Sequence, residues 1–224
     1  MEYQTIKFCI LGDAAVGKTS FIKRFFDDKF SRQYISTIGA FPYVKSIQAG
    51  NQNYSLSFID VSGNEKFLST VMPKIQNCTT IIFMYDVTNK ESFGLISKWI
   101  EAVKENNKID GLQMYLIGSK IDLESERKIP TEAGKGVAEK IGMDFFEISS
   151  KTGENEFDPM FFIIKRILNL PEKFSEPMII NGYNLTEIAL RNEKSCCYCC
   201  HWIMSILLIM NLKILGLINL LRIY

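Results

Sequence analysis

The sequence predicts an α/β fold in which a doubly wound, mainly parallel sheet carries helices on both faces. From Thr5 to about Leu170, short apolar runs alternate with amphipathic stretches, as strands and helices do in such folds. Residues 80–85 and 114–117 are apolar without polar alternation, which is typical of strands covered by helices on both sides. Ligands of these folds bind at the carboxyl ends of the strands, so a binding site is expected there.

Each element follows from its own pattern. Residues 6–11 form the first apolar run, and residues 18–27 form a helix that begins after a glycine-rich turn. Gly50 and Asn51 separate two strand-like runs, which predicts a hairpin. Residues 91–105 place Phe93, Ile96 and Val103 on one side of a helix. The prediction is six strands, one of them an antiparallel edge strand (6–11, 43–47, 54–59, 80–85, 114–117 and 144–148), and four helices (18–27, 91–105, 131–141 and 157–168).

Composition divides the chain into two unequal parts. Its 224 residues are 47% hydrophobic, which excludes wholesale disorder. The net charge of only +1 argues against a basic surface over the whole chain that would bind nucleic acid. Residues 196–224 are strongly apolar and hold two basic and no acidic residues. We predict a domain over 1–170, a variable linker over 171–195 and a tail over 196–224. Residues 1–7 are polar, so no signal peptide is expected and the chain is made in the cytosol.

A phosphate-binding loop is predicted between the first strand and the first helix. Residues 12–19 read Gly-Asp-Ala-Ala-Val-Gly-Lys-Thr, which fits Gly-x4-Gly-Lys-Ser/Thr in the strand–loop–helix context that gives this motif its meaning. Backbone N–H groups converge there on a phosphate, helped by the helix dipole. Lys18 would reach the β- and γ-phosphates, and the Thr19 hydroxyl would bind Mg²⁺. The predicted nucleotide-binding residues of this loop are Gly12, Ala14, Ala15, Val16, Gly17, Lys18, Thr19 and Ser20.

With this loop in place, residues 5–170 resemble the Ras superfamily of small GTPases. Thr37 is similar to the threonine that completes the Mg²⁺ shell when a γ-phosphate is present, and Phe30 to the aromatic residue against the base. Asp60 begins a D-x-x-G-Q-E-like run, which implies that it holds Mg²⁺ through water and that the Gly63 N–H faces the γ-phosphate. The resemblance thus implies a metal site of Thr19, Thr37 and Asp60, catalytic roles for Lys18, Gly63 and Asn64, and nucleotide contacts from Phe30, Tyr34, Thr37 and Gly63.

Two further runs are similar to the loops that read guanine. Residues 119–122 fall at an N-K-x-D position, and residues 149–151 resemble an S-A-K loop. A carboxylate such as Asp122 accepts two parallel hydrogen bonds from guanine N1–H and N2–H₂, whereas adenine would leave it buried and unpaired. The Lys120 stem would pack on the base. The predicted base contacts are Ser119, Lys120, Asp122, Ser149, Ser150 and Lys151.

Within the superfamily, the chain resembles the Rab group of vesicle-traffic regulators. Residues 36–39 and 85–93 carry this resemblance, together with a cysteine cluster after a long linker. Asn64 stands where the family has Gln, and its shorter stem predicts slow hydrolysis because the attacking water is less well oriented. Ser119 replaces Asn, and a hydroxyl bridges fewer partners, which predicts faster nucleotide exchange. Pro42 departs from the family's effector-binding run and favours a sheet edge.

The cysteine-rich tail admits four interpretations. Cys196, Cys197, Cys199 and Cys200 resemble the prenylated end of Rab proteins, but the chain continues for 24 residues beyond them. Residues 202–221 contain 15 apolar residues, enough for a membrane span despite Lys213. The alternatives are a tail anchor with lipidated cysteines, a natural end near Cys200, an interfacial helix, and zinc binding, which the crowded cysteine spacing disfavours.

The expected function is therefore a monomeric switch that binds GTP or GDP with Mg²⁺ and hydrolyses GTP by water attack. Effectors, an exchange factor and a GTPase-activating protein are expected at the loops around Thr37 and Gly63. The tail implies association with the cytoplasmic face of endomembranes, and no nucleic-acid partner is expected. Two alternatives stay open: a GTP-binding module with negligible hydrolysis, and a phosphate-loop enzyme of other specificity, such as a kinase.

Overall fold

The structure is a computed structural model that describes residues 4–33, 35–64, 72–73, 75, 77–106, 111–171, 177–180 and 183–187. Tyr34 and the whole tail over 196–224, with its four clustered cysteines, lie outside the described residues. The predictions made for them therefore stay predictions.

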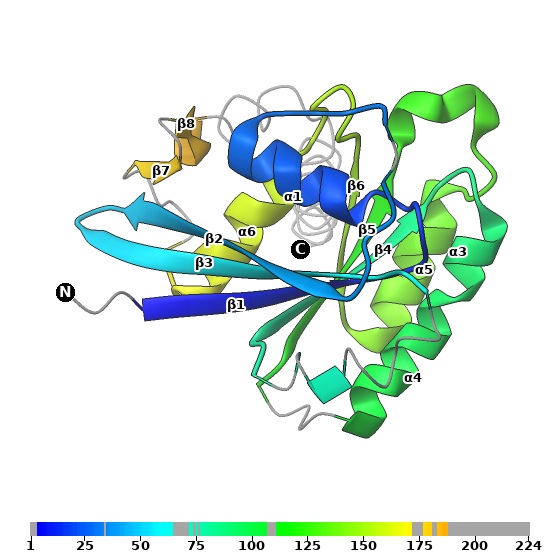
Figure 1. Ribbon diagram of the computed structural model, residues 1–224, viewed down its shortest axis with the longest axis horizontal. Coiled ribbons are helices and arrows are strands. Elements are labelled where there is room, and N and C mark those ends of the chain that lie inside the picture. The colour runs from blue at the N-terminus through cyan, green and yellow to red at the C-terminus, as the bar shows by residue number, and fades with distance from the viewer. Residues whose placement is uncertain are drawn as a thin grey trace, which may run out of the picture.

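Within the described residues, one mixed sheet runs through the molecule in the order β6-β5-β4-β1-β3-β2-β7-β8 (Figure 1). Neighbouring strands from β6 to β3 are parallel, whereas β2, β7 and β8 each pair antiparallel. The predicted fold class is confirmed, and the sheet has two short strands more than the six expected. The strands are β1 (Gln4–Leu11), β2 (Ala40–Ala49), β3 (Gln52–Val61), β4 (Thr80–Asp86), β5 (Gln113–Ser119), β6 (Asp144–Ile148), β7 (Met178–Ile180) and β8 (Tyr183–Asn184).

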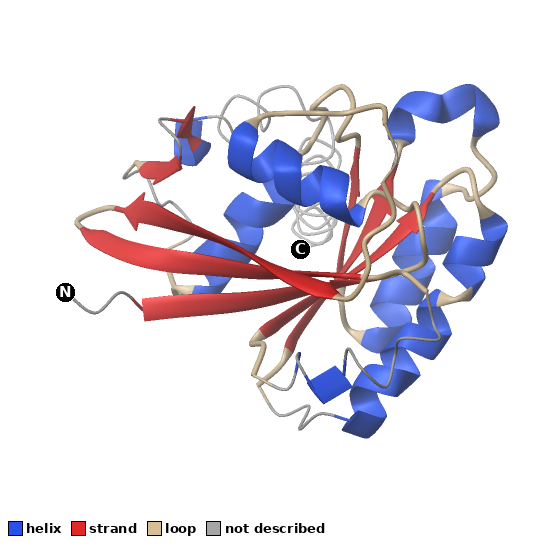
Figure 2. Ribbon diagram, viewed as in Figure 1, coloured by secondary structure: helices blue, strands red, loops and turns tan. Residues whose placement is uncertain are grey.

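Helices cover both faces of the sheet (Figure 2). On one face Phe8 and Ile10 of β1 join the core beneath α1 and α6, and on the other Cys9 and Leu11 join the core beneath α4 and α5. This alternation is the period of two that a strand imposes on its side chains. The helices are α1 (Lys18–Asp27), α3 (Lys90–Gly94), α4 (Ile96–Asn106), α5 (Thr131–Ile141) and α6 (Asp158–Ile167).

The single helix predicted over 91–105 is in fact two helices. Leu95 lies between α3 and α4, and its N–H still bonds to the carbonyl of Glu91. Gly94 precedes it, and the Ser97 hydroxyl donates to the Gly94 carbonyl at 3.1 Å. Glycine has a low helix propensity, and this side-chain hydrogen bond competes with the regular backbone pattern, so the helix is interrupted at this point.

Part of the predicted linker adds β7 and β8 to the sheet. Gln48 and Ala49 at the end of β2 pair with Ile179 and Met178 of β7. Met178, Ile180 and Leu185 are buried in the core shared with α1 and α6, and none of them is more than 1% exposed. The antiparallel strand β2 is therefore an edge only over its first part, which includes Pro42. None of the helices formed by the described residues combines the length and the apolar character needed to cross a bilayer.

Candidate functional site

The loop between β1 and α1 has the geometry of an anion cradle. Gly12 has φ +146°, and a Cβ there would lie 2.1 Å from the Met84 carbonyl oxygen, so only glycine fits against β4. Gly17 has φ 106° and caps α1 without a side-chain hydrogen bond. The N–H groups of the first turn of α1 are thus left for a ligand at the positive end of the helix.

Lys18 lies inside this loop. Its Nζ donates to the carbonyl oxygens of Gly12 at 2.9 Å and Asp13 at 2.6 Å. Burial lowers the pKa of Lys18 to about 8, against the opposing charges of Asp60 and Asp13. This buried ammonium group is placed to donate to the oxygens of a bound phosphate. Phosphate binding would replace its two neutral carbonyl acceptors with charged ones, which form stronger hydrogen bonds.

Three oxygen-bearing side chains meet beside Lys18. The Thr19 hydroxyl donates to Asp60 Oδ2 at 2.6 Å and lies 3.0 Å from the Thr37 hydroxyl, which is 3.4 Å from the same carboxylate oxygen. Asp60 Oδ1 is buried and has no hydrogen-bond partner among the described residues. Burial raises the pKa of Asp60, although the hydroxyls of Thr19 and Thr37 and the Lys18 charge act against the shift. A hard cation such as Mg²⁺ fits this set of oxygens and the unsatisfied Oδ1.

The loop after β3 touches the phosphate loop directly. A Cβ on Gly63 would lie 2.3 Å from the Ala14 backbone nitrogen, so this close approach requires glycine. The next residue, Asn64, is exposed, and its backbone N–H donates to the Ser62 hydroxyl at 3.4 Å. Gly63 and Asn64 therefore stand at the phosphate end of the site.

Asp122 forms the opposite end of the site. Its Oδ1 accepts from the Ser149 hydroxyl at 2.6 Å and its Oδ2 from Lys151 Nζ at 2.9 Å. Burial by itself would raise the pKa of Asp122, but the hydrogen bonds from Ser149 and Lys151 outweigh it and the net shift is downward. The carboxylate is thus ionised and oriented, as a double acceptor for a base must be.

Lys120 has a partner that sequence reasoning missed. Its Nζ lies 2.6 Å from Asp86 Oδ2, and the other Asp86 oxygen accepts from the N–H and hydroxyl of Thr88. Lys120 itself adopts φ 65°. Asp86 ends β4 and Lys120 follows β5, so the ion pair joins two adjacent strand ends and fixes the ammonium while the stem lines the cavity.

Ser119 lines the cavity at the end of β5, and its hydroxyl joins three segments. Its hydroxyl is 2.5 Å from the Val16 carbonyl and 2.8 Å from the Tyr85 carbonyl. The hydroxyl thus links the end of β5 to the phosphate loop and to β4, while the predicted faster nucleotide exchange stays a prediction. A single hydroxyl proton serves only one of the two carbonyls at a time.

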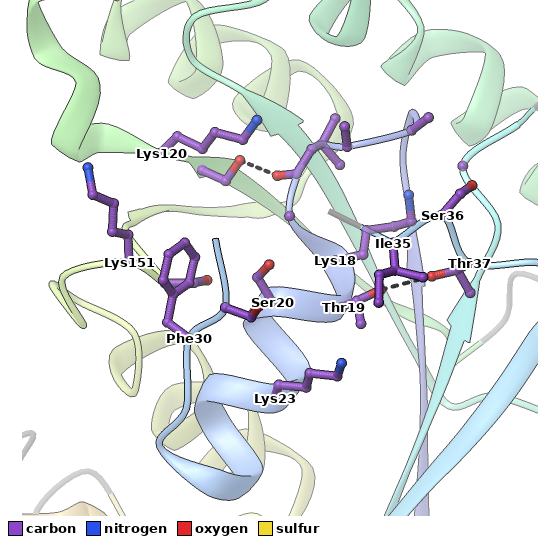
Figure 3. Close-up of a pocket in the computed structure, with 18 of the residues that line it drawn as sticks. Lys18, Thr19, Ser20, Lys23, Phe30, Ile35, Ser36, Thr37, Lys120 and Lys151 are labelled. Carbon is purple, nitrogen blue, oxygen red and sulfur yellow. Dashed lines mark hydrogen bonds between the residues drawn. The ribbon is translucent and has the colours of Figure 1, made fainter. Parts of the chain in front are cut away.

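These parts line one cavity of about 470 Å³, a volume within the range of small-ligand sites. Figure 3 shows Phe30, Lys120 and Lys151 at one end and Lys18, Thr19 and Thr37 at the other. Six basic side chains and one carboxylate line it among the described residues, so it suits a polyanion. The predicted site residues that line it are Ala14, Ala15, Val16, Gly17, Lys18, Thr19, Ser20, Phe30, Thr37, Gly63, Asn64, Ser119, Lys120, Asp122, Ser150 and Lys151.

Gly12, Asp60 and Ser149 do not line the cavity but contact residues that do, while Tyr34 lies outside the described residues. The lining residues that sequence reasoning missed lie on α1 and in the loop that follows it, at the end of β3 and directly after it, and beside Asp122. Lys23 could have been predicted from the sequence, because it stands one helical turn beyond Thr19 and so lies on the same face of the helix. The positions of the others depend on how the loops fold. The missed lining residues are Lys23, Lys29, Ser31, Arg32, Gln33, Ile35, Ser36, Val61, Ser62 and Leu123.

Comparison with known proteins agrees with this geometry. Residues 7–169 match the model of the Ras family. The chain is 39% identical over 145 residues to Ras-related protein Rab-3B of Rattus norvegicus, covering 65% of this chain and 66% of that protein, just under two thirds. It is 32% identical over 178 residues to Rab-3D of Homo sapiens, covering 80% and 81%. It is 30% identical over 191 residues to Rab-44 of Mus musculus, covering 85% of this chain and 19% of that protein.

Proposed function

The chain belongs to the Ras family of small GTPases and is Rab-like, and from this premise we propose that it is a Mg²⁺-dependent GTP/GDP switch. In this proposal it hydrolyses GTP slowly, acts as a monomer, and regulates vesicle traffic from the cytoplasmic face of endomembranes.

One observation supports the proposal above the others. A single basic cavity joins the cradle around Lys18, the oxygen cluster of Thr19, Thr37 and Asp60, and the ionised carboxylate of Asp122. The first binds phosphates, the second suits a hard divalent cation, and the third accepts a pair of hydrogen bonds from guanine. A nucleoside triphosphate with Mg²⁺ is the ligand whose parts match all three.

The proposed hydrolysis depends on position and charge. Bound Mg²⁺ would supply Lewis-acid stabilisation of the phosphate oxygens. Lys18 would neutralise the charge that develops on the β- and γ-phosphates, while the Gly63 N–H would face the γ-phosphate. The Asn64 amide would orient the attacking water, but its stem is one methylene shorter than that of Gln. A misplacement on the order of 1 Å costs ~100-fold in rate, so intrinsic turnover is slow and the GTP state is long-lived.

Asn64 also favours a second candidate function. If the amide does not reach the water at all, the chain works as a GTP-binding module that recruits effectors with negligible hydrolysis. The two functions share every binding contact and differ only in the rate of γ-phosphate loss.

Partners are proposed at the segment that carries Thr37. Ile35, Ile38 and Phe41 are exposed to 73%, 76% and 54%, and such a cluster of large apolar side chains marks an interaction surface. Effectors, the exchange factor and the activating protein would bind there and near Gly63, because these loops respond to the γ-phosphate.

Membrane attachment is proposed through lipidation of the clustered cysteines Cys196, Cys197, Cys199 and Cys200, with the apolar residues after them as a second anchor. Two anchoring signals give the stable attachment that one acyl chain does not. Intact-mass measurement of the protein isolated from its native cells would detect prenyl or palmitoyl groups and would identify the C-terminal residue.

The proposed function is tested with the full chain purified in detergent. Binding of GTP, GDP and ATP is measured by calorimetry with Mg²⁺ and with EDTA, and single-turnover hydrolysis by phosphate release. Guanine nucleotides should bind far more tightly than ATP and depend on Mg²⁺. Lys18→Ala should abolish binding, while Lys7→Ala, at an exposed lysine of β1, should leave it unchanged. Equal affinity for ATP and GTP would contradict the proposal.

A further inference from the structure

Glu156 is a buried acidic residue outside the nucleotide cavity. It follows the loop after β6 and precedes α6, and its exposure is 0%. Its Oε1 accepts a hydrogen bond from the Ser150 hydroxyl at 3.3 Å, while its Oε2 is buried without a hydrogen-bond partner in the described part of the chain. A carboxyl group is rarely buried without a role that offsets its desolvation. Ser150 lines the cavity, so Glu156 stands one residue behind the site.

Arg24 of α1 packs against the same loop. The guanidinium lies over Gly153, where an added Cβ would be 2.7 Å from Arg24 Nη2. Gly153 has φ +84°, a conformation that favours glycine, and a Cβ there would also displace the Arg24 guanidinium. Arg24 Nε is buried without a hydrogen-bond partner among the described residues, although its Nη1 binds Asp28. The loop tip is therefore held between α1 on one side and the Glu156 carboxyl on the other.

The loop itself is closed by backbone hydrogen bonds. The N–H of Ser149 donates to the Glu154 carbonyl at 2.9 Å, the N–H of Gly153 to the Ser149 carbonyl at 2.8 Å, and the N–H of Glu156 to the Gly153 carbonyl at 3.3 Å. These hydrogen bonds tie the residues of the loop to one another. Its Ser149 and Lys151 side chains are the two donors that orient Asp122, so a displacement at Glu156 reaches the base-reading carboxylate through one intervening loop.

We propose that Glu156 is a positioning residue for guanine recognition, because its buried carboxyl holds Ser150 and thereby fixes the loop that orients Asp122. The inference rests on the proposed function, since it names what holds the base-reading part of the same site. Glu156 does not contact the nucleotide in this scheme. It acts through Ser150, and its effect is on base affinity and not on the phosphate chemistry.

The charge state of Glu156 gives the mechanism a distinctive signature. Burial raises the pKa of Glu156 to about 8, with the Ser150 hydrogen bond and the Arg24 charge acting against the shift. The groups that face it are Ser150 from its own loop and Arg24 from α1. The carboxyl is neutral at pH 7, and its ionisation at higher pH places a charge in a buried site that the loop must open to hydrate.

The experiment measures the dissociation of fluorescent GDP from the full chain with Mg²⁺ between pH 6.5 and pH 9. Four variants are compared with the parent: Glu156→Ala, Ser150→Ala, the double variant of both, and Glu156→Gln. Glutamine keeps the volume and the acceptor oxygen but cannot ionise. Glu154→Gln is the matched control, because Glu154 is an exposed glutamate of the same loop.

Glu156→Ala should raise the GDP dissociation rate about tenfold, the kinetic equivalent of ~1.4 kcal/mol. The double variant should be no faster than the faster single variant, because both substitutions remove one interaction. The parent rate should rise above pH 8 and the Glu156→Gln rate should not, while Glu154→Gln should follow the parent.

Additive effects in the double variant, or identical pH profiles for the parent and Glu156→Gln, would overturn the inference while the proposed function stands. If Glu156→Ala does not fold, the Glu156→Gln pH profile decides by itself. A parent chain that does not bind GDP would overturn the proposed function and this inference with it.

Discussion

The Ser119 hydroxyl lies 2.5 Å from the carbonyl oxygen of Val16 and so joins the end of β5 to the phosphate loop across 103 positions of sequence. The Tyr85 carbonyl, at 2.8 Å, competes for the same proton. An asparagine amide has two donor hydrogens. Ser119→Asn should therefore slow GDP dissociation, by an amount corresponding to about 1–2 kcal/mol. Fluorescent GDP release measures this, with Ser46→Asn on the exposed face of β2 as the control, and an unchanged rate would contradict the argument.

Hydrolysis should respond to the length of the side chain at position 64. Asn64→Gln adds one methylene, so the amide would reach as far from the backbone as the Gln of the family does. The single-turnover rate should then rise at least about tenfold and at most ~100-fold, the loss expected from a misplacement on the order of 1 Å. Asn53→Gln makes the same change at an exposed position of β3 and should have no effect. Equal rates for the parent and Asn64→Gln would show that Asn64 does not limit hydrolysis.

The Thr37 hydroxyl should matter for Mg²⁺ in the GTP state and much less in the GDP state. It lies 3.0 Å from the Thr19 hydroxyl and 3.4 Å from Asp60 Oδ2, so its removal takes one oxygen from the cluster. Thr37→Ala should weaken Mg²⁺ binding to the GTP complex about tenfold, or ~1.4 kcal/mol. Thr37→Ser keeps the hydroxyl and should behave as the parent. Mg²⁺ titration of nucleotide release gives both values, and an equal loss in the GDP complex would argue against this role.

The folded protein should lose stability between pH 5 and pH 8 because of Glu156. The folded-state pKa of about 8 lies above the ordinary value of 4.5, so the folded state binds more protons in this range. The stability that protonated Glu156 contributes to the folded state is fully present below pH 4.5. The free energy of unfolding then falls as the pH rises to 8, by up to about 1.4 kcal/mol per pH unit. Urea unfolding at pH 5, 6.5 and 8 should give a steeper decline for the parent than for Glu156→Gln. Parallel declines would refute the assignment.

The parts of the site that sequence analysis places correctly are those whose chemistry is local. Gly12, Lys18 and Thr19 occur at fixed offsets between β1 and α1, and the structure places Gly12 in the loop and the other two at the start of α1, with Lys18 bonded back to the Gly12 carbonyl. The same reasoning predicted six strands and missed β7 and β8, because β7 pairs with β2 across more than 120 residues.

Tertiary partners cannot be read from the sequence for a related reason. The ion pair of Lys120 with Asp86 and the burial of Glu156 between two elements depend on how strand ends and loops meet. A Glu in a polar loop reads as solvated in the sequence, whereas in the folded protein Glu156 is fully buried and near the Arg24 charge of α1. The break at Leu95 was missed because the apolar period continues through it.

The pairing of β7 with β2 and of β8 with β7 shortens the length of chain between the packed domain and Cys196. If β7 and β8 were not part of the sheet, the packed domain would end near Leu170. The 26 residues from there to Cys196 could then reach ~90 Å when fully extended. From Glu187, where the described chain ends, nine residues remain and reach ~30 Å at most, whatever conformation they adopt. A lipid on Cys196 would hold the domain within about one bilayer thickness of the membrane surface. Large partners would then have to approach from the side that faces the cytosol.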